Sequence, residues 1–251
     1  MSQDPPNPKS GQTKGPASKL ATLETSLGEL PVFPLPQVVL FPRAHLPLHI
    51  FEQRYRAMLR DAMASHGFLV IARLCDRGTP VGQEGTIGEP PLCRIAGVGA
   101  IVEHELMSDG RANIVVTGMQ RIEMEELPFA PPYRRVRAKI LAESTGAIAA
   151  PDRTALLAAA HSFVSEVHRR DSSFRFHLPP SLEPGAIADL CAHHLVIDAD
   201  ARQAILEELD VPTRITRVTR ELAMQQQILG RGESASGRGG GGSGSGGGAL
   251  N

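Results

Sequence analysis

The sequence predicts an α+β fold in which a β-rich half is followed by an all-helical half. From residue 30 to 141, short apolar runs and alternating apolar residues are broken by Gly and Pro, which is typical of strands and turns. From residue 151 to 229, apolar residues recur at a spacing of three and four, which is typical of helices. We therefore predict two subdomains, joined by a linker at residues 142–150.

The two ends of the chain differ from both halves. Residues 1–29 are rich in Pro and polar residues, and residues 230–251 consist mainly of Gly and Ser. Such segments bury too little apolar surface to offset the entropy lost on ordering. We expect both to be disordered tails.

The β-rich half is expected to hold five or six short strands and one helix, and to form a small, strongly bent sheet or pseudo-barrel. The helix should run from about Glu52 to His66, because its apolar residues share one face. In the long strand expected at 92–107, Gly97 and Gly99 mark a bend or bulge. The other apolar runs of this half lie at 30–36, 38–41, 46–51, 68–72, 113–117, 121–127 and 136–140.

The second half is expected to form a bundle of four helices packed beside the sheet. Pro151 lies near the start of the first helix and Pro184 opens the second, since proline suits the first helical turn. Asp198 and Asp210 are the expected N-caps of the third and fourth helices. Gly230 is the expected end of the last one.

Composition excludes several classes of protein. The formal net charge is −1 and aromatic residues make up 4% of the chain, so nothing requires a nucleic-acid or membrane partner. The 3 cysteines form no disulfide-scaffold or C-x-x-C pattern, which suits a reducing compartment. With no apolar leader and no apolar run near 18 residues, the chain is expected to be cytoplasmic.

One block of sequence resembles a known family. Three short stretches follow one another and lead into Arg54-Tyr55-Arg56: they are Pro34-Leu35-Pro36, Val39-Leu40-Phe41-Pro42 and Leu46 to Glu52. This order is similar to the opening of the N-terminal, substrate-binding domain of Lon proteases. Two further stretches resemble the same family: Gly118-Met119-Gln120-Arg121 and Leu206 to Val211.

The resemblance implies a PUA-like pseudo-barrel followed by a helical bundle, and a role in binding unfolded or partner polypeptides. Lon ATPase activity requires a Gly-Lys pair in a phosphate-binding loop, and this chain contains none. A Ser-Lys peptidase dyad is also not expected, because three of the lysines precede residue 20 and Lys139 lies on an alternating strand. We therefore predict a stand-alone, non-enzymatic protein without cofactors, whose partners include a separate protease or chaperone.

Two aromatic residues are the candidate docking residues for a client polypeptide. Phe174 and Phe176 lie in a polar stretch between two expected helices. They are expected either to pack back against the neighbouring domain, the interpretation we prefer, or to form an exposed apolar patch.

The alternative function is an RNA- or nucleotide-binding PUA-like module. Its candidate residues for an anionic partner are Arg134, Arg135, Arg137 and Lys139. Alternation favours a simpler interpretation, in which these side chains form the solvated face of an edge strand. Nucleic acid is therefore not the expected partner.

No metal site is expected. His45 and His49 are four residues apart in an extended, Pro-broken segment, where we do not expect them to share a face. His193 and His194 are adjacent on a helix and so point in different directions. No cysteine or carboxylate stands at ligand spacing from either pair.

Overall fold

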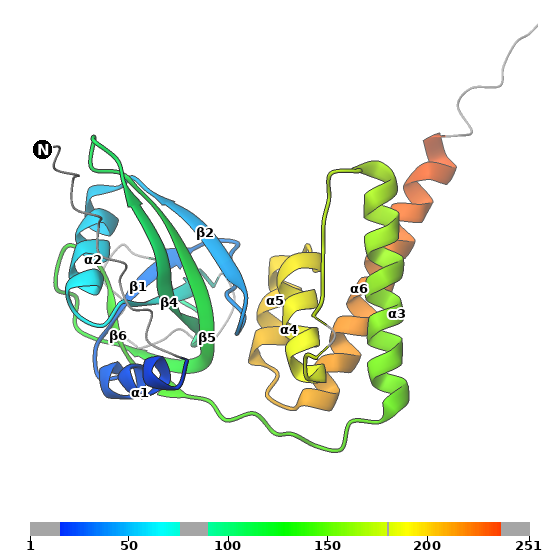
Figure 1. Ribbon diagram of the computed structural model, residues 1–251, viewed down its shortest axis with the longest axis horizontal. Helices are drawn as coiled ribbons and strands as arrows, with labels where there is room; N and C mark the ends of the chain where they lie inside the picture. Colours follow the sequence, from blue (N-terminus) through cyan, green and yellow to red (C-terminus); the bar gives the residue numbers. More distant parts are fainter. Residues whose placement is uncertain (1–15, 76–89, 180, 237–251) are drawn as a thin grey trace, which may run out of the picture.

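The computed structural model describes residues 16–75, 90–179 and 181–236. In this part of the chain there are six helices and six strands (Figure 1). The strands are β1 (Leu30–Leu35), β2 (His45–Ile50), β3 (Phe68–Arg73), β4 (Ile95–Leu106), β5 (Ala112–Glu126) and β6 (Arg135–Ile140). The helices are α1 (Pro16–Ser26), α2 (Gln53–Ala64), α3 (Ala150–Arg170), α4 (Pro184–Leu195), α5 (Ala199–Glu207) and α6 (Val211–Ser236).

The strands form one sheet that closes on itself. Their order is β2-β5-β4-β3-β1-β6, and β6 also pairs with β5, so five strands complete a ring and β2 lies outside it. β6 therefore has a neighbour on each side. The expectation that its basic residues lie on an edge strand is therefore wrong. The alternation of residues within β6 could not show that this strand pairs with both β1 and β5, because that pairing forms only in the folded chain.

The two longest strands, β4 and β5, extend beyond the ring as a pair. β4 pairs with β3 only through Gly97–Ala100, whereas it pairs with β5 along its full length. β5 is one continuous strand where the sequence suggested two, and its first half also pairs with β2. We call β2, residues 102–106 and residues 112–117 the arm; it is a three-stranded sheet continuous with the ring.

Two glycines allow a chain segment to cross the sheet closely. A Cβ at Gly97 would collide with the carbonyl oxygen of Leu40, and one at Gly118 with that of Phe41. Residues 38–41, an expected strand, are therefore not a strand but a buried crossing segment. The expected bulge is confirmed, since the β4–β5 register shifts between Val98 and Gly99.

The expected N-terminal tail contains a helix. α1 places Leu23, which is fully buried, against the apolar residues of the ring, including Leu30, Val98 and Val136. The expectation of disorder is thus wrong for residues 16–26. The apolar residues of α1 are few, and only the assembled ring gives them a surface to cover.

The four C-terminal helices pack on one another beside the barrel. α4 and α5 lie on the side nearer the barrel, while α3 and α6 form a long outer pair (Figure 1). The side chains of Asp198 and Asp210 accept hydrogen bonds from the N–H groups of Ala201 and Thr213, as expected for N-caps. α6 continues past Gly230 to Ser236, so the expected end of this helix is wrong.

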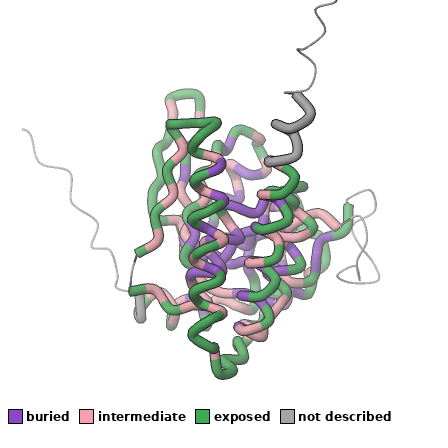
Figure 2. The backbone as a smooth tube through the Cα atoms, turned by 90° about the vertical axis from the view of Figure 1, so that its right-hand side faces the viewer, coloured by how far each residue is buried: buried purple, intermediate pink, exposed green. Residues whose placement is uncertain are grey.

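One apolar cluster runs through both parts of the molecule. It contains Phe33, Phe41 and Tyr55 from the barrel and α2, together with Leu156, Ile187 and Ile215 from the helices. Buried residues accordingly occupy the centre and exposed residues the outer helical surfaces (Figure 2). Among the described residues, no helix is long and apolar enough to span a membrane.

Two of the cysteines are joined, contrary to the expectation. Cys75 and Cys93 form a disulfide, with their Cα atoms 5.2 Å apart. The two flanking segments meet in an isolated antiparallel bridge between Leu74 and Leu92, and Cys93 N–H donates to the carbonyl of Arg73. Spacing alone could not reveal this pair, because the two cysteines are 18 positions apart along the chain.

Candidate functional site

A buried cluster of charged side chains joins the barrel to the helices. Arg121 of β5 is 1% exposed, and its guanidinium donates to both carboxylate oxygens of Asp189 on α4, at 3.0 and 2.5 Å. Arg214 of α6 lies 3.1 Å from the same carboxylate. Both guanidinium groups also reach Glu143, in the segment between β6 and α3.

This cluster is a structural clamp. Each charge in it is matched by a partner, so the removal of one member would leave another buried charge unpaired. The segment that holds Glu143 is itself fixed, because Ser144 N–H donates to Leu209 and its carbonyl accepts from Val211. Arg121 is the last residue of the stretch Gly118–Arg121 that carries part of the family resemblance.

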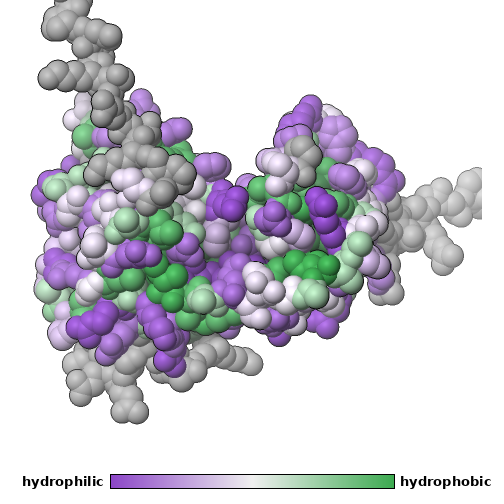
Figure 3. Space-filling view, turned by 60° about the horizontal axis from the view of Figure 1, so that its bottom comes forward, coloured by the Kyte–Doolittle hydropathy of each residue, from purple (hydrophilic) through white to green (hydrophobic). Residues whose placement is uncertain are grey.

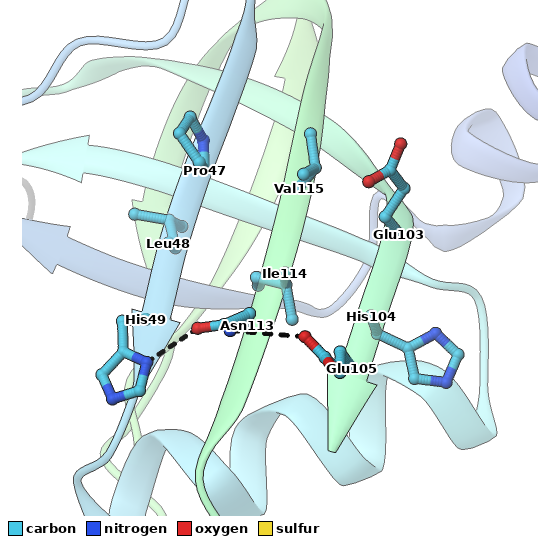
Figure 4. Close-up of a pocket in the computed structure, with 9 residues that line it drawn as sticks. All are labelled: Pro47, Leu48, His49, Glu103, His104, Glu105, Asn113, Ile114 and Val115. Atoms are coloured by element: carbon cyan, nitrogen blue, oxygen red, sulfur yellow. Dashed lines mark hydrogen bonds between the residues drawn. The ribbon is translucent and has the colours of Figure 1, made fainter. Parts of the chain in front are cut away.

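The outer face of the arm is polar and open. His49, Asn113 and Glu105 form a row across its three strands, in which Asn113 Oδ1 lies 2.8 Å from His49 Nδ1 and Asn113 Nδ2 donates to Glu105 at 3.5 Å (Figure 4). Pro47, Val115 and Glu103 form the next row. The hollow over this face has a volume of about 470 Å³.

The inner face of the arm meets α2 in a second groove, of about 390 Å³. Leu106 and His104 line it from β4, while Arg56, Arg60 and Met63 line it from α2. Leu106 is 70% exposed and Met63 is 40% exposed, so this groove presents apolar side chains to solvent. We call it the arm groove.

Apolar groups are exposed elsewhere on the surface as well. Phe51, between β2 and α2, is 60% exposed, and its ring stacks 6.1 Å from His49. The face turned forward in Figure 3 carries apolar patches on both the barrel and the helical part, with a hollow between them. The arm groove differs from these patches because it combines exposed apolar groups with a sheet edge.

The expected docking residues Phe174 and Phe176 are half-buried. Both pack against the shared apolar cluster, and the Phe176 ring lies 5.7 Å from that of His194 on α4. They therefore pack back against the molecule, and Phe176 does so on α4 of its own half. A role for them in docking stays a prediction.

Three of the four basic residues proposed for an anionic partner are engaged with carboxylates. Arg134 is buried and makes two hydrogen bonds of 2.6 Å with Glu126, which contradicts its assignment to an exposed basic patch. Arg135 lies 3.3 Å from Glu29, and Arg137 lies 3.6 Å from Glu125. Lys139 is exposed and stands opposite Glu123 in the sheet.

The histidines form two groups. His45 and His49 do share one face of β2, where they lie beside Thr117 and Asn113, so the contrary expectation is wrong: a strand repeats every two residues. His193 and His194 contact each other at 4.8 Å between ring centroids. Burial lowers the pKa of His193 to about 4. Among the described residues, no group of histidines, cysteines and carboxylates is arranged to hold a metal ion.

The chain matches the model of the ATP-dependent protease La (LON) substrate-binding domain over residues 29–224. The chain belongs to this family. The sequence resemblance is thereby confirmed, over nearly all the expected folded region.

Individual members of the LON family agree with this assignment. The Lon protease of Dictyoglomus thermophilum is 26% identical over 208 residues, which is 80% of this chain and 25% of that protein. Lon protease 2 of Herpetosiphon aurantiacus is 30% identical over 206 residues, 80% of this chain and 24% of that protein. The chain thus spans about a quarter of the length of these relatives.

The fold agrees with solved LON-family structures. The N-terminal domain of Mycobacterium avium complex Lon protease has a TM-score of 0.55 at 18% identity, and covers 78% of this chain and 98% of its own. The Lon N-terminal domain protein from Xanthomonas campestris also gives 0.55, at 17% identity, with 76% and 96% covered.

Sequence reasoning missed the arm groove. Leu106 was only one residue of the strand expected at 92–107. Nothing in its alternating pattern showed that this strand, β4, would extend beyond its neighbour β3. The available signal was length, since the run 92–107 exceeds the other expected strands of its half.

Proposed function

We propose that the chain is a non-catalytic polypeptide-binding module with a PUA-like barrel, which recognises unfolded clients or a partner polypeptide. The observation that carries the proposal is the arm groove, where Leu106 and Met63 are exposed beside a sheet edge. An unfolded chain can bind such a surface, because its apolar side chains can contact the exposed apolar groups and its backbone can form hydrogen bonds with the unpaired strand edge. Family membership supports the same role, for which a separate protease or chaperone is a suitable partner.

The nucleic-acid alternative receives no comparable support. Its central residue, Arg134, is buried against Glu126, and the other three basic residues stand beside or opposite Glu29, Glu125 and Glu123. The carboxylates beside the three arginines offset the positive charge that phosphate binding requires.

The proposal is tested by titrating the purified chain into a fluorescent, reduced and carboxymethylated lactalbumin, and into its folded, disulfide-bonded form. We expect binding of the unfolded form alone, with only a modest loss of affinity between low and high salt, because most of the contacts are apolar and few are ion pairs. A steep fall in affinity with added salt, together with binding to single-stranded RNA, would instead support the nucleic-acid module. Neither ATP nor casein should be hydrolysed.

A matched pair of variants locates the binding surface. Leu106→Ser combined with Met63→Ser should weaken client binding roughly tenfold, as for exposed apolar contact residues. Met224→Ser combined with Ile228→Ser removes similarly exposed apolar groups from α6, 49% and 67% exposed, and should leave affinity unchanged. Equal losses in both variants would mean that binding is unspecific.

A further inference from the structure

The arm has two outer edges, and they differ in their backbone donors. On the β2 edge, Gly118 N–H donates to Ala44, and antiparallel pairs alternate between bonded and unbonded. The backbone N–H and C=O groups of Leu46, Leu48 and Ile50 therefore bond to β5. The backbone groups of the residues between them point away from β5, towards the outer edge. The central outward residue is Pro47, which has no N–H to offer, so this edge is blunted against strand pairing.

The β4 edge is not blunted in this way. Met107 N–H donates to Arg111, so by the same alternation Glu105 and Glu103 bond to β5 while His104 and Leu106 direct their N–H and C=O groups outwards. Within the described residues, Val102–Leu106 have no second strand beside them. Figure 4 shows His104 extending away from β5 at this edge.

The two faces of this edge have different chemistry. Side chains of an added strand that point inwards would lie beside Leu106 and Met63 in the arm groove. Those that point outwards would lie beside Glu103 and Glu105, which are exposed and to which no cation is paired in the described part of the chain. Cross-strand neighbours of opposite charge stabilise a sheet, and like charges destabilise it.

We propose that the free edge of β4 binds an extended polypeptide by strand addition, and that it selects segments in which apolar residues alternate with Lys or Arg. Apolar residues of the segment enter the arm groove, and its basic residues pair with Glu103 and Glu105. Backbone hydrogen bonds to His104 and Leu106 provide affinity that does not depend on sequence. This inference rests on the proposed function and specifies the class of client.

The probes are two fluorescein-labelled octapeptides at nanomolar concentration, one alternating valine with lysine and one alternating valine with glutamate. Wild type should bind the lysine peptide about tenfold more tightly, since two cross-strand charge pairs change sign. The double variant Glu103→Lys and Glu105→Lys should reverse this preference. An unchanged preference in that variant overturns the assignment of the two carboxylates.

The role of the backbone is tested by two substitutions at one position. His104→Pro removes the outward N–H and should weaken binding of the lysine peptide about three- to tenfold, while His104→Ala keeps the N–H and should stay within about twofold. Thermal melting by circular dichroism checks that each variant folds; should His104→Pro not fold, the charge-reversal variant still decides. Equal affinities in the proline and alanine variants would overturn strand addition.

Two other results are distinguishable. If wild type binds unfolded lactalbumin and His104→Pro does so equally well, the proposed function stands and the site lies elsewhere. If wild type binds neither peptide nor lactalbumin, the proposed function itself fails. The β4 edge could also pair with a second copy of this chain, which sedimentation of the chain alone tests. A dimer that His104→Pro abolishes would assign this edge to a second copy and not to a client.

Discussion

The junction between barrel and helices and the arm both carry charged residues, and they use them in opposite ways. At the junction, Arg121, Asp189 and Arg214 are buried and each is matched by a partner. On the arm, Glu103 and Glu105 are exposed and lie next to exposed apolar groups. Charge that is satisfied inside the molecule stabilises one arrangement of its parts, whereas charge left on an open edge is available to a partner.

The largest effect is expected at the junction. Asp189→Ala leaves two buried guanidinium groups without their shared carboxylate and should lower the free energy of unfolding by about 3–5 kcal/mol. Urea denaturation measures the loss. Glu105→Ala on the arm is the control, with an expected change below about 0.5 kcal/mol; similar losses at the two sites would remove the distinction.

The next effect tests the N-terminal helix. Leu23→Ala opens a cavity where α1 packs against the barrel, and should lower the free energy of unfolding by about 2–5 kcal/mol. Exposed Glu24 provides the matched substitution, Glu24→Ala, expected to be near neutral. A neutral Leu23→Ala would restore the sequence-based expectation of a disordered segment.

The disulfide should contribute a comparable amount. Reduction of Cys75–Cys93 is expected to lower the free energy of unfolding by about 3 kcal/mol, because the open chain gains entropy when unfolded. Thiol titration of the native, unreduced chain should find no reactive group, since Cys191 is buried and burial raises its pKa to about 12; unfolding should expose one thiol. Three thiols in the unfolded, unreduced chain would show that the pair is not joined.

A smaller effect is expected from pH. Burial lowers the pKa of His193 from 6.5 to about 4, so the unfolded chain binds more protons between these values. Stability is therefore fully present above pH 6.5 and is lost as pH falls towards 4. Between pH 7 and 5 the loss should be about 1–2 kcal/mol, measured by urea denaturation at each pH. His193→Gln should make this dependence shallower; part of it should remain, because burial also lowers the pKa values of His66 and His194.

The smallest effect is expected at the surface of β6. Arg137→Ala breaks a 3.6 Å pair with Glu125, in which both side chains are mostly exposed, and should change stability by less than about 0.5 kcal/mol. RNA affinity should not respond either. A marked loss of RNA binding in this variant would revive the nucleic-acid alternative.

The prediction of elements succeeded where one period dominates. The expected helix at 52–66 is α2, and the apolar stripe from Tyr55 to Ala62 is its buried face. The prediction of elements failed where the structure of a segment depends on the distant residues that it packs against. Residues 38–41 are as apolar as a strand, yet Gly97 and Gly118 let them cross the sheet instead of joining it.

The candidate site was less accessible to sequence reasoning. Phe174 and Phe176 stood out because aromatic residues in a polar stretch are conspicuous, but their exposure depends on α4. Arg134 looked like its neighbours Arg135 and Arg137, and only the fold placed it beside Glu126. Leu106 looked like an ordinary strand residue because solvent exposure is a property of the assembled sheet.

By itself, the sequence determined the order of a β-rich and a helical half, most element positions and the family, because periodicity and local motifs act within a few residues. The tertiary structure alone decided the closure of the barrel by β5 and β6, the docking of α1, the Cys75–Cys93 pair and the free edge of β4. Each of these depends on which distant segments meet, and that is settled by packing and by the pairing of backbone groups across the whole chain.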